Sequence, residues 1–204
     1  MNNRSTLGVK ARVSRRDFLK KTAATAATTT LGSLDIARNA HAAGNGIIKV
    51  GLVGCGGRGT AAAINALNSG PDVRLVALAD IFDERLQQSL ERLKKAKPNQ
   101  VQVKNDNCFI GFDAYEKLIA SGVDVVLIAP ASHFIPQILK AAVDAGKHVF
   151  CEKPHGIDMP GVAVCEAASE VARTKKLSLV SGLCWRYDEG VRETMNVQEP
   201  VAGL

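Results

Sequence analysis

The sequence of 204 residues has few aromatic residues, scattered cysteines and no long apolar run. No stretch approaches the roughly 18 consecutive apolar residues that a membrane-spanning helix requires. The five cysteines occur singly and form no Cys-x-x-Cys pair, which argues against a zinc site and against a disulfide scaffold. The nine aromatic residues offer few stacking platforms for single-stranded nucleic acid. A membrane anchor, a bound metal and a single-strand binder are therefore disfavoured.

Positive charge is present in excess, with a net charge of +6 at pH 7. Such an excess ordinarily suggests a nucleic-acid partner. However, residues 1–42 hold eight Lys and Arg residues against two Asp residues, and the other 162 residues carry 18 basic and 18 acidic groups. The whole excess therefore belongs to the N-terminal segment, and the neutral remainder gives no reason to expect nucleic acid as a partner.

The first 42 residues have the order of parts that an export signal has. Residues 14–20 read Ser-Arg-Arg-Asp-Phe-Leu-Lys, which resembles a twin-arginine signal; a weakly apolar Ala/Thr run follows, and Ala40-His41-Ala42 forms a small-x-small cleavage site. We therefore expect a twin-arginine signal peptide over 1–42, recognition by the twin-arginine export machinery, and a periplasmic or other extracytoplasmic location. The alternative is a disordered basic arm. Because this route carries folded proteins, it also predicts a bound cofactor.

From residue 46 onward, short apolar runs alternate with segments of helical spacing. Strands that alternate with helices of ten to fifteen residues form right-handed βαβ units and a parallel sheet. We therefore predict an α/β fold with a Rossmann-like, doubly wound parallel sheet. The expected strands are 47–53, 74–79, 123–128, 147–151 and 177–181, and the expected helices are 61–68, 82–95, 135–145 and 161–174.

The turn after the first expected strand contains Gly54, Gly56 and Gly59, which form a Gly-x-Gly-x-x-Gly motif. In a dinucleotide site the first glycine permits a tight turn, the second lets the backbone approach a pyrophosphate, and the third allows close helix–strand packing. Gly57 and Arg58 lie in the same loop, at a helix N-terminus whose unpaired N–H groups favour anions. The motif predicts dinucleotide binding; the alternative is an ordinary glycine turn.

The second expected strand leads to Asp80, which lies 21 residues after Gly59. A carboxylate at this place accepts hydrogen bonds from both ribose hydroxyls of adenosine and repels the 2′-phosphate of NADP. The sequence therefore predicts NAD as the cofactor. NADP stays open because Arg58 or Arg85 could meet a phosphate, and the alternative role for Asp80 is to cap the following helix.

Two later segments give the chain a resemblance to a known family. One is Ala129-Pro130-Ala131-Ser132-His133, and the other runs from Ala145-Gly146-Lys147-His148-Val149 to Glu152-Lys153-Pro154. With the glycine loop and Asp80, they resemble the Gfo/Idh/MocA oxidoreductases in order and spacing over residues 47–195. The stretch from Gly182 to Tyr187 is similar to the strand-to-linker stretch of that family.

The resemblance implies roles for individual residues. Lys153 would stand near the nicotinamide, hydrogen-bond the reacting hydroxyl or carbonyl, and exchange a proton while hydride moves to the cofactor. Glu152 would anchor this turn, and Pro154 would fix it through a cis bond. His133 matches a position that contacts the cofactor or has a structural role, and an ordinary loop histidine is nearly as good an interpretation. The full predicted cofactor-binding set is Gly54, Gly56, Gly57, Arg58, Gly59, Asp80, Pro130, His133, Glu152 and Lys153, of which Lys153 is also the catalytic residue.

The resemblance further implies an exported NAD(P)-dependent oxidoreductase that acts on a secondary alcohol of a sugar, sugar derivative or cyclitol. Family members usually continue into an α+β domain that covers the nicotinamide and supplies most substrate contacts. Here we expect residues 43–195 to form the nucleotide-binding domain and the start of a linker, 196–204 to be a tail without family character, and the second domain to be missing. The chain alone would then have doubtful activity. The alternatives are the NAD-dependent glycosidase branch of the superfamily, against which Lys153 argues, and a chain that only binds nucleotide or has no function.

Overall fold

The computed structural model describes residues 46–196. The predicted signal peptide, residues 43–45 of the predicted domain and residues 197–204 of the predicted tail lie outside the described residues. Within the described part, no helix combines the length and the apolar character that crossing a bilayer demands.

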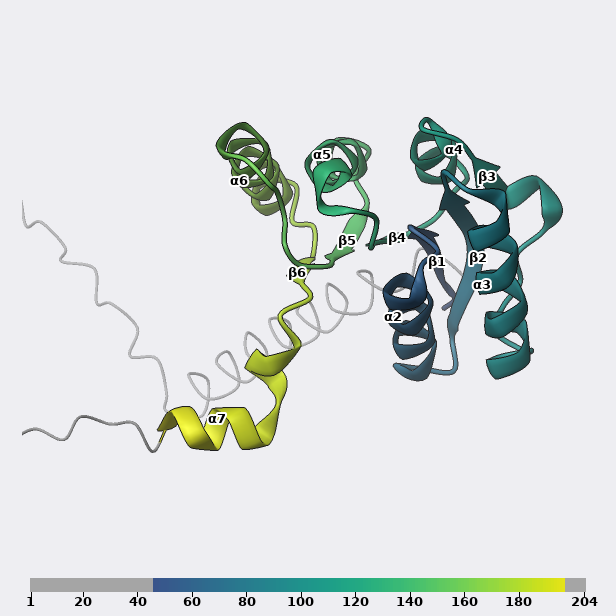
Figure 1. Cartoon of the computed structure of the whole chain (residues 1–204), viewed down its shortest axis with the longest axis horizontal. Helices are drawn as coiled ribbons and strands as arrows, with labels where there is room; N and C mark the ends of the chain where they lie inside the picture. The colour runs from purple at the N-terminus through teal and green to yellow at the C-terminus, as the bar shows by residue number, and fades with distance from the viewer. Residues whose placement is uncertain (1–45, 197–204) are drawn as a thin grey trace, which may run out of the picture. The chain divides into compact units, whose positions relative to one another are not determined.

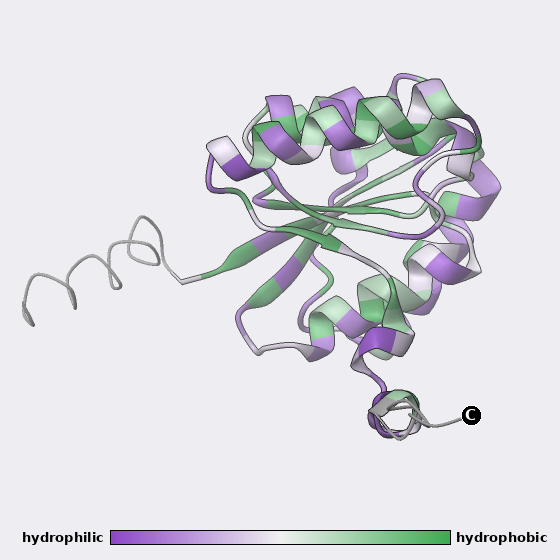
Figure 2. Ribbon diagram, turned by 90° about the vertical axis from the view of Figure 1, so that its left-hand side faces the viewer, coloured by the Kyte–Doolittle hydropathy of each residue, from purple (hydrophilic) through white to green (hydrophobic). Residues whose placement is uncertain are grey.

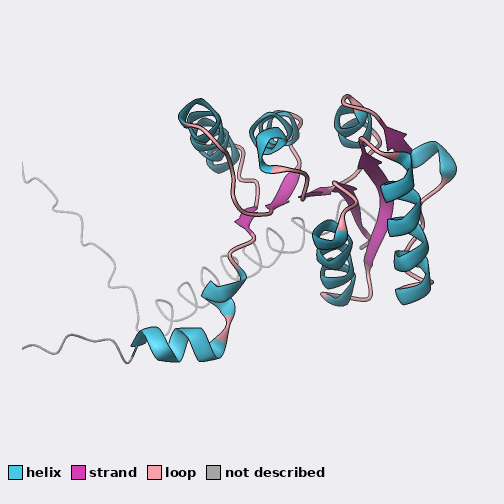
Figure 3. Ribbon diagram, in the orientation of Figure 1, coloured by secondary structure: helices cyan, strands magenta, loops and turns pink. Residues whose placement is uncertain are grey.

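Six parallel strands form one sheet in the order β3-β2-β1-β4-β5-β6 (Figures 1 and 3). From β1 the sheet continues through β2 to β3 on one side. The chain then crosses back, so that β4, β5 and β6 lie on the other side of β1. This is the strand order of a dinucleotide-binding Rossmann fold, so the predicted fold class is confirmed. The strands are β1 (Ile48–Val53), β2 (Val73–Asp80), β3 (Cys108–Ile110), β4 (Val125–Ile128), β5 (His148–Cys151) and β6 (Leu179–Ser181).

Helices cover both faces of the sheet, as Figure 2 shows with the strands between two helical layers. The α-helices are α2 (Gly57–Asn68), α3 (Asp83–Ala96), α4 (Ala114–Ala120), α5 (Ile135–Asp144), α6 (Met159–Thr174) and α7 (Glu189–Asn196). Three short 3₁₀ turns, η1 (Asn105–Asn107), η2 (Ser132–Phe134) and η3 (Cys184–Tyr187), lie between these elements.

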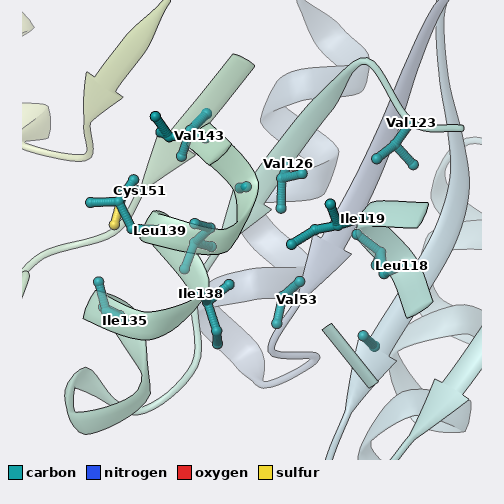
Figure 4. Packing of buried hydrophobic residues seen from close by; sticks show 14 of the residues in the cluster. Val53, Leu118, Ile119, Val123, Val126, Ile135, Ile138, Leu139, Val143 and Cys151 are labelled. Atoms are coloured by element: carbon teal, nitrogen blue, oxygen red, sulfur yellow. The ribbon is translucent and has the colours of Figure 1, made fainter. Parts of the chain in front are cut away.

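Each face of the sheet has its own apolar core. On one face, α4 and α5 bury Leu118, Ile138 and Val143 against Val126 of β4 (Figure 4). The other face has a second cluster, to which α2 and α3 contribute their buried leucines. Strands that are covered on both faces are mostly apolar, which explains why β1, β2 and β4 were recognisable from their apolar residues although β1 contains Lys49 and β2 contains Arg74.

Three elements were not expected from the sequence: β3, α4 and α7. The strand β3 has only three residues and α4 only seven, so neither is long enough to show a periodic apolar pattern. The helix α2 begins at Gly57, four residues before the expected start at 61. Glycine is a poor helix former, and the two glycines of the first turn therefore hid the true start of this helix.

Close backbone packing brings the start of α2 against the end of β1. Gly54 has φ +92°, and a Cβ there would lie 2.5 Å from the Ala129 carbonyl carbon and the Pro130 nitrogen. A Cβ on Gly59 would lie 1.9 Å from the carbonyl oxygen of Gly54. The tight turn expected at Gly54 and the close helix–strand contact expected at Gly59 are therefore both present. At Gly57, by contrast, a Cβ would meet nothing within 4 Å.

This contrast gives a stability prediction with an internal control. Gly59→Ala places a methyl group against the carbonyl oxygen of Gly54. We expect this substitution to lower the free energy of unfolding by about 1–3 kcal/mol or more, the range for overpacked sites. Gly57→Ala, two residues away in the same helix, should change stability by less than about 1 kcal/mol, in the stabilising direction, because alanine favours helix. Urea denaturation of both variants measures the difference. Equal stabilities for the two variants would contradict the packing role of Gly59.

Candidate functional site

A cleft opens at the carboxyl ends of the central strands, where the strand order reverses between β1 and β4. Gly54 and Gly56 line it from the glycine loop, Asp80 lines it from the end of β2, and Pro130 lines it after β4. Four predicted cofactor residues from three separate segments therefore meet at one place. Ligands of open parallel sheets bind at such a reversal point, so this cleft is the candidate nucleotide site.

The start of α2 is open toward solvent beside this cleft. Gly56 precedes the helix, no side chain caps the helix, and its first turn contains no acidic residue. A Cβ on Gly56 or Gly57 would meet nothing within 4 Å, so the backbone is free to approach a ligand on this side. Unpaired N–H groups and the positive end of the helix dipole favour anions here. The geometry fits the pyrophosphate of a dinucleotide.

The carboxylate of Asp80 ties the glycine loop to the end of β2. Its Oδ2 accepts a hydrogen bond of 2.6 Å from the backbone N–H of Cys55, and its Oδ1 accepts one of 2.9 Å from Phe82. The alternative role for Asp80 as a helix cap is not seen, because α3 has Phe82 at its N-cap position and no side chain caps it. Each carboxylate oxygen keeps further acceptor capacity, which suits the ribose hydroxyls of adenosine.

The thiol of Cys55 takes no part in this arrangement. It is buried within the loop and donates a weak hydrogen bond of 3.6 Å to the Ala79 carbonyl oxygen. Burial raises the pKa of the Cys55 thiol far above its usual value, so the thiol stays protonated. This agrees with the expectation that Cys55 is a space-filling residue of the loop.

Aromatic and apolar side chains form the wall of the cleft next to Asp80. Phe112, from the loop before α4, and Phe134, from η2, have ring centroids 6.1 Å apart. Arg85 of α3 also lines the cleft, with its guanidinium carbon 5.1 Å from the centroid of the Phe82 ring. Such a wall suits a flat base. Sequence reasoning missed the aromatic residues because they belong to short elements with no recognisable motif.

A second group of predicted residues meets at the end of β5. Glu152 is buried at 4% exposure, and its carboxylate accepts a hydrogen bond and forms an ion pair with the guanidinium of Arg58. This hydrogen bond raises the pKa of Arg58 above its usual value. Lys153 follows as an exposed residue, and the Lys153–Pro154 bond is cis, as the family resemblance implied. The glycine loop and the Glu-Lys-Pro turn are therefore directly connected.

Two predicted cofactor residues, Arg58 and His133, are not among the residues that line the cleft. Arg58 lies at the start of α2 but is engaged with Glu152, so its guanidinium is not among the groups beside Asp80. His133 is exposed in η2 and packs edge-on against the ring of Phe134, at 5.2 Å between centroids. It therefore supports the wall of the cleft instead of lining it.

Comparison with known proteins agrees with this geometry. The family model of the Gfo/Idh/MocA oxidoreductases, described as an oxidoreductase family with an NAD-binding Rossmann fold, matches residues 48–183. An inositol 2-dehydrogenase of Salmonella paratyphi B is 28% identical over 151 residues, which is 74% of this chain and 41% of that protein. A glycosyl hydrolase family 109 protein of Shewanella amazonensis is 26% identical over 197 residues, covering 88% of this chain and 41% of that protein.

The solved structures lead to the same fold. The scyllo-inositol dehydrogenase of Lactobacillus casei with bound NAD(H) and scyllo-inositol has a TM-score of 0.56 and 25% identity, over 74% of this chain and 40% of that one. The chain thus spans about two fifths of the length of these relatives. With the family model matched along all six strands of the sheet, the chain belongs to the Gfo/Idh/MocA oxidoreductases and contains their NAD-binding Rossmann domain.

Proposed function

We propose that this chain is the cofactor-binding part of an exported NAD-dependent dehydrogenase that oxidises a ring hydroxyl of a cyclitol or a related sugar. One observation carries the proposal: the uncapped N-terminus of α2, the carboxylate of Asp80 and the turn that bears Lys153 all lie at the carboxyl edge of one sheet. The inositol dehydrogenases among its relatives support the substrate class. The twin-arginine pattern of residues 1–42 supports export.

In this proposal each part of the site has a separate task. NAD supplies the hydride acceptor when bound. The N–H groups at the start of α2 hold the pyrophosphate, Asp80 accepts hydrogen bonds from the adenosine ribose, and the wall with Phe112 and Phe134 packs against the adenine. The exposed amine of Lys153 hydrogen-bonds the reacting hydroxyl of the substrate and takes up its proton.

A second candidate function is hydrolysis of a glycosidic bond through a transient NAD-dependent oxidation. The observation in its favour is the glycosyl hydrolase family 109 relative, whose similarity extends over 197 residues. The presence of Lys153 favours the dehydrogenase, because we expect the glycosidase branch often to replace this lysine. The two functions differ in products: a dehydrogenase accumulates NADH, whereas the glycosidase releases its leaving group without net redox change.

The first prediction of the proposal concerns the choice between NAD and NADP. Titration of the purified chain should show saturable binding that is tighter for NAD⁺ than for NADP⁺. Asp80→Asn keeps the shape of the side chain but removes the charge that repels the 2′-phosphate, so the preference for NAD⁺ should fall about tenfold, or about 1.4 kcal/mol. Asp72→Asn, which lies just before the other end of β2, is the matched control and should leave the preference unchanged. Absence of binding for both nucleotides would refute the proposed function.

The second prediction concerns Lys153. Lys153→Met removes the group that accepts the proton. In a form of the protein that also carries the α+β domain expected from the family, the rate of NADH formation from NAD⁺ and inositols should therefore fall by about 10²–10⁴. The affinity for NAD⁺ should change much less, because the pyrophosphate and ribose contacts remain. Lys147→Met, beside the opposite end of β5, is the control and should keep the parent rate. NADH absorbance measures the rate, and an unchanged rate in Lys153→Met would exclude proton transfer by this residue.

Release of a chromogenic aglycone from a glycoside substrate without formation of NADH would instead favour the glycosidase.

A further inference from the structure

The ion pair of Arg58 with Glu152 differs from the other ion pairs of the described residues. Four such pairs are present, and three of them join side chains only three or four positions apart in the sequence. Arg58 and Glu152 are 94 positions apart, and their pair connects the first turn of α2 to the residue that follows β5. This contact therefore links two segments of the nucleotide site that no other ion pair of the described part connects.

The surroundings of Glu152 hold its carboxylate in one place. The side chain is 5% exposed, whereas that of Arg58 is 50% exposed. A Cβ on Gly182 would lie 2.9 Å from both carboxylate oxygens, so the carboxylate packs directly on the chain after β6. The backbone N–H of Glu152 donates a hydrogen bond of 2.8 Å to the carbonyl oxygen of Ile128 at the end of β4. Because a buried carboxylate needs a compensating charge, Glu152 depends on Arg58 in a way that exposed surface pairs do not.

We propose that Arg58 is a positioning residue: through Glu152 it holds the turn that carries Lys153 in a fixed position relative to the glycine loop, which binds the pyrophosphate in the proposed function. This rests on the proposed function, in which Lys153 faces the nicotinamide end of the cofactor. The consequence is that the guanidinium of Arg58 serves the turn and not the phosphates. The cation beside Asp80 that could meet a 2′-phosphate is then Arg85, which lines the cleft.

The competing role for Arg58 is direct contact with the pyrophosphate, and ligands of different length separate the two roles. ADP-ribose contains both phosphates and the adenosine but lacks the nicotinamide. A phosphate ligand contributes equally to the binding of ADP-ribose and of NAD⁺. A residue that positions the turn affects only the nicotinamide half, so it changes the ratio of the two affinities.

The test uses Arg58→Met, Glu152→Gln and the double variant of the full 204-residue chain. We expect each single variant to lower the affinity for NAD⁺ about tenfold relative to that for ADP-ribose in calorimetric titrations, a usual size for coupling between two parts of a site. The double variant should resemble the single ones, because the two side chains act as a unit. Amide hydrogen exchange without ligand should accelerate at residues 149–156 in each variant.

Arg173→Met and Glu170→Gln are the matched controls, since they break an exposed ion pair of α6 with the same substitutions. Neither control should alter the affinity ratio or the exchange at residues 149–156. Equal losses for ADP-ribose and NAD⁺ in Arg58→Met, with parent affinities in Glu152→Gln, would overturn the proposal in favour of a phosphate contact. Unchanged exchange at residues 149–156 would overturn it by itself, even if no nucleotide bound, and failure of the parent chain to bind either nucleotide would separately refute the proposed function.

Discussion

The contact on which the site depends is the approach of Gly59 to the carbonyl oxygen of Gly54, which leaves no room for a side chain. This contact fixes the start of α2 directly against the end of β1. Two consequences follow from that placement. The uncapped start of the helix lies beside the cleft, and a helix N-terminus of this kind favours an anion. The second residue of the helix, Arg58, also comes within reach of Glu152 in the turn after β5. Substitution of Gly59 would therefore disturb both the candidate phosphate site and the turn that bears Lys153.

Local sequence patterns predicted the parts of the fold that depend on local chemistry. Short apolar runs predicted five of the six strands, since strands covered on both faces carry mostly apolar side chains. Glycine spacing predicted the loop, because the positive φ of Gly54 and the backbone contact of Gly59 exclude other residues. The short strand β3 and the helix α4 escaped prediction, since their formation depends on neighbours in the sheet and in the core.

The candidate site was predictable to a similar degree. The spacing of the glycines, Asp80 and the Glu-Lys-Pro segment identified residues that the fold brings to one edge of the sheet. The aromatic wall and the partner of Arg58 were not predictable. Phe112 follows a strand too short to recognise, and the pair of Arg58 with Glu152 joins positions 94 residues apart, for which the sequence has no local signal. Long-range side-chain pairing is decided by the fold as a whole.

The described residues contain two buried carboxylates, Asp80 and Glu152, and both belong to the candidate site. Burial of an ionised group requires compensation, and the two residues receive it differently. Asp80 is held by backbone N–H groups, which carry no net charge, so its negative charge stays available for the ribose of the proposed cofactor. Glu152 is neutralised by a full positive charge on Arg58, so it contributes little net field beside the turn. In the proposed function, the same chemical group thus recognises the adenosine end of the cofactor at Asp80 and supports the turn that bears Lys153 at Glu152.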